Sequence, residues 1–116
     1  MTLLEKQFEF SRLVPLLLAK AFELGYSVTL GEAYRSPEEA ARLAKAGKGI
    51  KNSLHTSRLA IDLNLFRDGV YMTSEESHRA LGTYWETLSA GKPYTCAWGG
   101  HFGDGNHYSI EDGNRK

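Results

Sequence analysis

The segment Leu59–Phe66 constrains the fold more than any other part of the sequence, because it alternates along its whole length. In an extended strand one face would carry Leu59, Ile61, Leu63 and Leu65, and the other Ala60, Asp62, Asn64 and Phe66. A carboxylate in the middle of such a strand is costly to bury without a partner. Since Ala60 and Asn64 on the same face are small or polar, we interpret the Asp62 face as the wall of a site.

Helices are predicted on both sides of this strand. The spacing of apolar residues predicts a helix over residues 3–24, kinked or interrupted at Pro15. Ser36-Pro37-Glu38-Glu39 is typical of a helix start, and this second helix would end near residue 46. Thr73-Ser74-Glu75-Glu76 predicts a capping box that opens a third helix, with a buried stripe made of Leu81, Tyr84, Trp85 and Leu88.

Shorter strands complete the expected fold. Alternation predicts a strand within residues 26–35, and residues 67–69 form a hairpin turn into a short strand at 70–72. A last strand is expected at 107–110, after a glycine-rich segment. This order predicts an α+β fold with a small, mainly antiparallel sheet flanked by helices. With 116 residues, the chain has room for one domain, residues 1–116.

Charge and cysteine content exclude several classes of protein. Fourteen Lys and Arg balance fourteen Asp and Glu, which argues against a nucleic-acid binder, a nuclease or a polybasic membrane-surface protein. The single Cys96 cannot form an internal disulfide and excludes a cysteine-based zinc knuckle. We find no signal peptide and no run of about 18 apolar residues, so we expect a protein made in the cytoplasm without membrane insertion. We also expect a monomer.

Histidine and carboxylate residues recur at spacings that favour a metal site. His55 lies seven residues before Asp62, and Asp104 lies three residues before His107 at the start of the late strand. A loop that enters the central strand can fold His55 over the Asp62 face. Two imidazoles and one carboxylate make a catalytic type of zinc site, with a fourth position left for water.

Each of these pieces has a simpler explanation when it is taken alone. A histidine seven residues before an aspartate occurs by chance, Asp104-Gly105-Asn106 can be a surface turn, and Asp62 with Asn64 can be the polar face of an edge strand. Arg35 by itself suggests a surface salt bridge to Glu38 or Glu39. The fixed order of these pieces along the chain is far more specific than any one of them.

Two segments resemble a known family of peptidases. Residues 53–62 read SLHTSRLAID and residues 103–109 read GDGNHYS. They resemble the zinc peptidases of the D-alanyl-D-alanine carboxypeptidase and hedgehog-like superfamily, peptidase family M15, and especially its short phage endolysins that act as L-alanyl-D-glutamate peptidases. The resemblance extends over about residues 26–109 and implies a hedgehog-like fold.

The resemblance also implies roles for individual residues. His55, Asp62 and His107 would bind one zinc ion, Asp104 would be the catalytic base and acid, and Arg35 would stabilise the oxyanion. Ser53 would support the site or position the substrate. Two departures matter: Arg58 stands where many relatives have glycine, and Asp104 stands where other branches more often have glutamate.

Five further residues are assigned more loosely. Asn64, Trp98 and His101 are candidates for substrate contact or support of the site, although Trp98, like Phe102, is equally well explained as core. His101 is a rival third metal ligand. His78, within the third predicted helix, is expected on the surface.

The function that we predict is hydrolysis of a peptide bond in the stem peptide of bacterial peptidoglycan, with zinc as cofactor. The L-alanyl-D-glutamate bond is the expected target. The alternatives are a D-alanyl-D-alanine carboxypeptidase and a non-catalytic zinc-bearing binding or virion module on the same fold. Such an enzyme would be made in the host cytoplasm and act on the cell wall after release, or from a phage particle.

Overall fold

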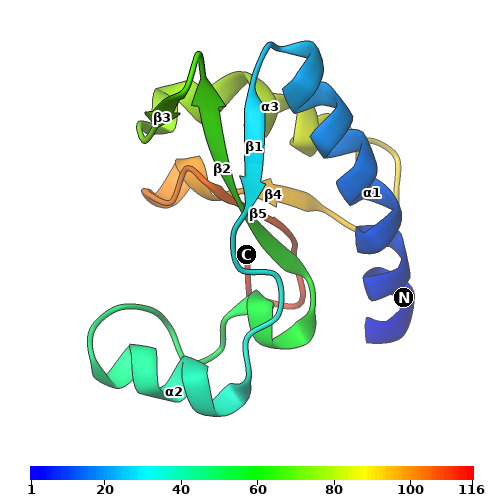
Figure 1. Cartoon of the computed structure of the whole chain (residues 1–116). Helices are drawn as coiled ribbons and strands as arrows, with labels where there is room; N and C mark the ends of the chain where they lie inside the picture. Colours follow the sequence, from blue (N-terminus) through cyan, green and yellow to red (C-terminus); the bar gives the residue numbers. More distant parts are fainter.

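The computed structural model describes residues 1–116 and contains five short strands in one antiparallel sheet (Figure 1). The order across the sheet is β1-β2-β5-β4, and β3 pairs with β2. The strands are β1 (Ser27–Leu30), β2 (Ala60–Arg67), β3 (Val70–Met72), β4 (Cys96–Trp98) and β5 (His107–Ile110). The helices are α1 (Leu3–Glu23), α2 (Pro37–Lys45) and α3 (Glu75–Thr87), with 3-10 turns at η1 (Leu54–Ser57) and η2 (Gly99–Phe102). The α+β prediction is therefore confirmed.

Strand β2 is the centre of the sheet. Its first half pairs with β5, which places Asp62 opposite His107, and its second half pairs with β1 and β3. The predicted hairpin between β2 and β3 turns at Asp68 and Gly69, whose φ angles of 51° and 77° are those that a tight two-residue hairpin requires. Because β2 has neighbours on both edges, its side chains are held in a fixed register.

The helix starts follow from capping side chains. Thr2 and Glu5 form a capping box at α1, and Ser36 accepts a hydrogen bond from the Glu39 amide at α2. The capping box expected at Thr73 is wrong: the N-cap of α3 is Ser74, whose side chain accepts from the Ser77 amide. Pro15 does not break α1, which continues to Glu23.

The core lies between the sheet and helices α1 and α3. The predicted apolar face of the central strand is buried, and it packs against side chains of both helices. The core includes Leu17, Ala21, Leu59, Leu63, Leu65, Leu81 and Trp85. Trp85 also donates a hydrogen bond of 3.0 Å from its Nε1 to the Ser109 carbonyl, which fixes α3 to β5. Helix α2 stands apart from this core in Figure 1 and buries only Ala40.

Two further expectations differ from the structure. The strand expected within residues 26–35 ends at Leu30, because the backbone beyond it bonds to the segment that carries His55 and to the β2 residue Asp62. His78 is 2% exposed rather than on the surface, since its Nδ1 lies 2.7 Å from the Tyr108 hydroxyl across the core. None of the helices has the length and apolar character needed to cross a bilayer.

Candidate metal centre

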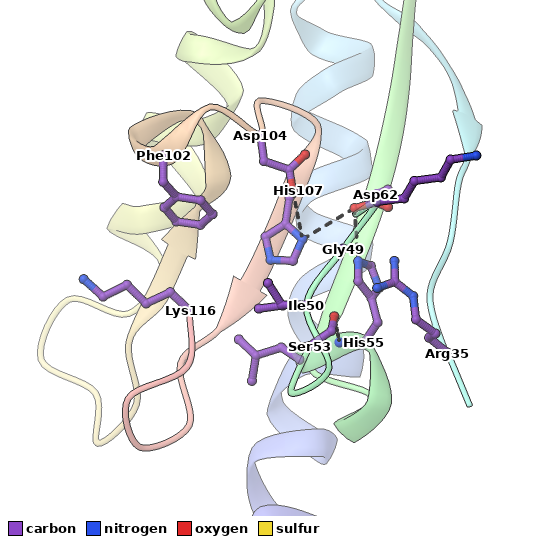
Figure 2. Close-up of a pocket in the computed structure, with 12 residues that line it drawn as sticks. Arg35, Gly49, Ile50, Ser53, His55, Asp62, Phe102, Asp104, His107 and Lys116 are labelled. Atoms are coloured by element: carbon purple, nitrogen blue, oxygen red, sulfur yellow. Dashed lines mark hydrogen bonds and ion pairs between the residues drawn. The ribbon is translucent and has the colours of Figure 1, made fainter. Parts of the chain in front are cut away.

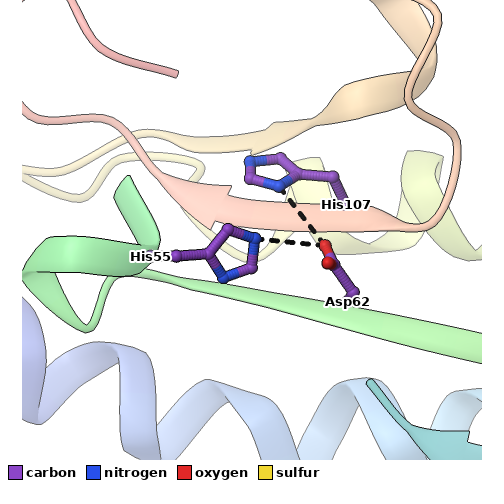
Figure 3. Close-up of side chains that lie close together, drawn as sticks. All are labelled: His55, Asp62 and His107. Atoms are coloured by element: carbon purple, nitrogen blue, oxygen red, sulfur yellow. Dashed lines mark ion pairs between the residues drawn. The ribbon is translucent and has the colours of Figure 1, made fainter. Parts of the chain in front are cut away.

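Three side chains from separate elements converge on the face of the sheet opposite the core (Figure 3). They are His55 from η1, Asp62 from β2 and His107 from β5, and one ligand atom of each lies within 4.8 Å of the others. His55 Nε2 is 3.2 Å from Asp62 Oδ1, and His107 Nδ1 is 3.5 Å from the same oxygen. The sequence prediction that these three residues share one site agrees with this geometry.

Local backbone structure explains how they meet. Asp62 and His107 are directly opposed in the β2–β5 pairing, so their side chains project on the same face. Ser53 caps η1, because its hydroxyl accepts a hydrogen bond of 3.2 Å from the His55 amide. The turn then ends at Arg58, which has the left-handed φ of 56°. This backbone conformation favours glycine over a residue with a side chain.

The surroundings of His55 leave one ring nitrogen free for a metal. Its Nδ1 lies 3.1 Å from the Ala33 carbonyl, to which an Nδ1–H donates. The lone pair of Nε2 then faces Asp62 Oδ1, and two acceptors so close together require a proton or a cation between them. The only two buried side-chain polar atoms without a hydrogen-bond partner, Asp62 Oδ1 and His107 Nε2, belong to this cluster. The donor set therefore fits a divalent cation such as zinc.

Electrostatics in the cluster favour the anionic carboxylate. Burial opposes ionisation of Asp62, but His107 and His55 outweigh it and lower its pKa to about 2. Burial likewise opposes protonation of His55, yet the Asp62 carboxylate raises the pKa of the ring. Asp62 is thus an anion throughout the neutral range and supplies the one negative charge of the ligand set.

A cleft of about 410 Å³ opens over the cluster (Figure 2). The two further residues assigned to catalysis, Asp104 and Arg35, both line it, as do Ser53 and Phe102. Asp104 Oδ2 lies 3.8 Å from His107 Nδ1. Partial loss of solvent in the cleft raises the pKa of Asp104, against the opposing effect of His107. A carboxyl with a raised pKa beside a candidate metal site is suited to exchanging protons.

Arg35 is held by a residue that the sequence did not point to. Glu32 accepts a hydrogen bond of 2.7 Å from Arg35 Nε and also pairs with Nη2. The same carboxylate lies 3.8 Å from His55 Nδ1. The only sequence signal was an acidic residue three positions before a basic one, which carries little information outside a helix. The salt bridge expected from Arg35 to Glu38 or Glu39 is replaced by the pair with Glu32.

The remaining candidate residues lie outside the lining of the cleft. Asn64 is bonded to Thr29 and Tyr71 at 3.2 Å each. Trp98 is 1% exposed, and its Nε1 donates a hydrogen bond of 2.7 Å to the Gly105 carbonyl. This bond anchors the loop that carries Asp104. His101 is not brought to the cluster: its Nε2 pairs with Glu86 at 2.9 Å. Arg58 also points elsewhere, with its guanidinium 4.0 Å from the centre of the Tyr34 ring.

Comparisons with known proteins agree with this arrangement. The family model described as D-alanyl-D-alanine carboxypeptidase, of the M15 peptidases, matches residues 46–110. The structure is similar to that of the L-Ala D-Glu endopeptidase ChiX of Serratia marcescens, with a TM-score of 0.73 and 19% identity over 89% of this chain and 78% of that one. No curated protein matches the sequence. Since the family model covers more than half of the chain, including all three residues of the cluster, the protein belongs to the M15 peptidase family.

Proposed function

We propose that the protein is a zinc-dependent peptidase that hydrolyses a peptide bond in bacterial peptidoglycan, between L-alanine and D-glutamate. The observation that carries the proposal is the cluster of His55, Asp62 and His107 at the base of a cleft that also contains Asp104 and Arg35. Membership of the M15 peptidases and the fold shared with an L-Ala D-Glu endopeptidase support it.

The ligands of the zinc ion would be His55, Asp62 and His107. The chemistry that zinc supplies in such a site is Lewis acidity, which polarises a carbonyl and acidifies a water molecule. Asp62 provides one negative charge against the two positive charges of zinc, so a site with two neutral histidines keeps a net charge of about +1. That charge favours the developing oxyanion of the substrate.

Asp104 and Arg35 would act on the two ends of the scissile bond. Asp104 takes a proton from the attacking water as the new carbon–oxygen bond forms. It then delivers this proton to the leaving nitrogen as the carbon–nitrogen bond breaks. Arg35 donates to the carbonyl oxygen as that oxygen becomes negative, and the planar, positively charged guanidinium group suits this task.

The identity of the cleaved bond distinguishes the proposed endopeptidase from a carboxypeptidase. The family model is described by D-alanyl-D-alanine carboxypeptidase activity, so release of terminal D-alanine is the second candidate. Purified peptidoglycan incubated with the zinc-loaded protein should give fragments with a new N-terminal D-glutamate, identified by mass spectrometry. Addition of a chelator should abolish their formation.

The other results of this experiment have distinct meanings. Free D-alanine without new D-glutamate termini would assign the carboxypeptidase activity instead. No chelator-sensitive cleavage of any wall peptide would contradict a peptidase role on peptidoglycan and favour a zinc-bearing binding module. A zinc analysis of the same sample shows whether the protein was loaded.

A further inference from the structure

The carboxylate of Glu32 pairs with Arg35, which lines the cleft, and lies 3.8 Å from His55 Nδ1. It engages Nε and Nη2 of Arg35 on one edge of the guanidinium. The remaining nitrogen, Nη1, lies beside Gly49, where a Cβ would come within 3.4 Å of it. Gly49 and Arg35 both line the cleft, so the edge that Glu32 leaves free is the edge next to the substrate space (Figure 2).

The backbone around Glu32 is bonded to two of the metal ligands. The Glu32 carbonyl accepts from the Asp62 amide at 2.9 Å, and the Gly31 amide donates to the Asp62 carbonyl at 2.8 Å. The Arg35 amide donates to the His55 carbonyl at 3.2 Å, and the Ala33 carbonyl accepts from the His55 ring. Residues 31–35 therefore hold Glu32 in a fixed place relative to His55 and Asp62, although they form no regular strand.

We infer that Glu32 is a positioning residue, which fixes the Arg35 guanidinium so that Nη1 points at the oxygen of the scissile carbonyl. This inference rests on the proposed function, because it gives Arg35 its task. A free arginine side chain has several rotatable bonds, and a carboxylate bonded to two of its nitrogens fixes the plane of the group. A donor fixed before the reaction stabilises the transition state better than one that must be ordered during it.

A second pair on the neighbouring helix provides a matched control. Arg42 donates from Nε to Glu39 at 2.7 Å and also pairs through Nη2, at the same spacing of three residues. This pair lies on α2, and neither residue lines the cleft. Glu39→Gln therefore removes the same type of interaction without touching the site.

The test is a double-mutant cycle on Glu32 and Arg35 in the zinc-loaded enzyme, with Glu39→Gln as control. Glu32→Gln should lower kcat by about tenfold or more while KM changes by less than about threefold, because the lost interaction acts in the transition state. In an Arg35→Ala background, the same change should lower kcat by less than about twofold further. Zinc affinity, measured by competition with a coloured chelator, should stay within about threefold of the unchanged protein.

Four results would overturn the inference. The first is full activity of Glu32→Gln while Arg35→Ala is impaired, which leaves the proposed function intact. The second is an equal fall in kcat on Glu32→Gln whether residue 35 is arginine or alanine. The third is weaker zinc binding by Glu32→Gln. Either result would mean that Glu32 acts through His55, which lies 3.8 Å away, instead of through Arg35. The fourth is full activity of Arg35→Ala, which would remove the role of Arg35 as well. If Glu32→Gln does not fold, Glu32→Asp takes its place in the same cycle, since it keeps the charge and draws the carboxylate back by one methylene.

Discussion

Three carboxylates around the cleft differ in their surroundings, and each difference suits a different task. Asp62 lies between two histidines, which keep it ionised, as a metal ligand must be. Asp104 is held in the loop before β5, by its amide to the Gly99 carbonyl at 2.9 Å, and its raised pKa favours proton exchange. Glu32 is paired with Arg35. The chemical role of an acidic residue here follows from its neighbours rather than from its type.

Replacement of Asp104 and of His55 should therefore have different effects. Asp104→Asn keeps the shape of the side chain but cannot take a proton, so hydrolysis should fall by at least about 100-fold while zinc stays bound. His55→Ala should lose the zinc itself, because it removes one of three ligands. Zinc content and the rate of wall-peptide hydrolysis measure the two effects separately. Asp68→Asn, in the β2–β3 turn, is the control, and full activity of Asp104→Asn would refute its role as the base.

At the scale of elements, the sequence predicted best where one face of an element is buried. Alternation predicted β2, and the Asp-Gly turn predicted β3, because both signals are local. The short strand β4 and the turn η1 were not predicted, since three or four residues are too few to show a period. Burial of His78 also escaped prediction, because its partner Tyr108 lies 30 residues away in the sequence. Of the site, the clustering of His55, Asp62 and His107 could be expected from their order in the sequence. The pairing of Glu32 could not, since its neighbours depend on tertiary structure.

The contact between α3 and β4 depends on the absence of a side chain at Gly82. A Cβ at this position would collide with the buried indole of Trp98. Although alanine has the higher helix propensity, Gly82→Ala should lower the free energy of unfolding by about 2 kcal/mol because of overpacking. Thr83→Ala on the exposed side of the same helix should change it by less than about 0.5 kcal/mol. Urea unfolding measures both, and equal stability of the two variants would mean that Trp98 can move aside.

The pairing of His78 with Tyr108 joins α3 to β5 and should make stability depend on pH. Burial lowers the pKa of His78 from 6.5 to about 4, so the folded state binds this proton less readily than the unfolded chain does. Stability is complete above pH 6.5 and is lost as the pH falls towards 4, by about 3 kcal/mol from this residue. His78→Asn does not titrate, so its unfolding free energy should fall less over this interval. Parallel pH profiles for the two proteins would contradict this assignment.

Over the whole molecule, the hydrophobic core and the candidate metal site lie on opposite faces of one sheet. Helices α1 and α3 cover the face of the sheet that holds the core (Figure 1). The cluster of His55, Asp62 and His107 and its cleft lie on the other face. The candidate metal ligands come from η1, β2 and β5 and include no residue of α1, α2 or α3. The core is therefore complete without the ion.

Removal of zinc should consequently lower the melting temperature without unfolding the protein at room temperature. A ligand that binds only the folded state stabilises it by about 4 kcal/mol at a concentration of about 1,000 times its Kd. Differential scanning fluorimetry with and without chelator measures the shift, and circular dichroism shows whether the helices persist. His55→Ala should show no shift on chelation. Loss of the helical signal on chelation would mean that the ion is needed for folding itself.

Because Asp62 and His107 are directly opposed, the candidate metal site depends on the register between β2 and β5. If β2 and β5 slipped by one residue, Asp62 would turn towards the apolar core and the two ligands would lie on different faces. A zinc ion held by both residues would therefore require the strand alignment that β2 and β5 have in this structure.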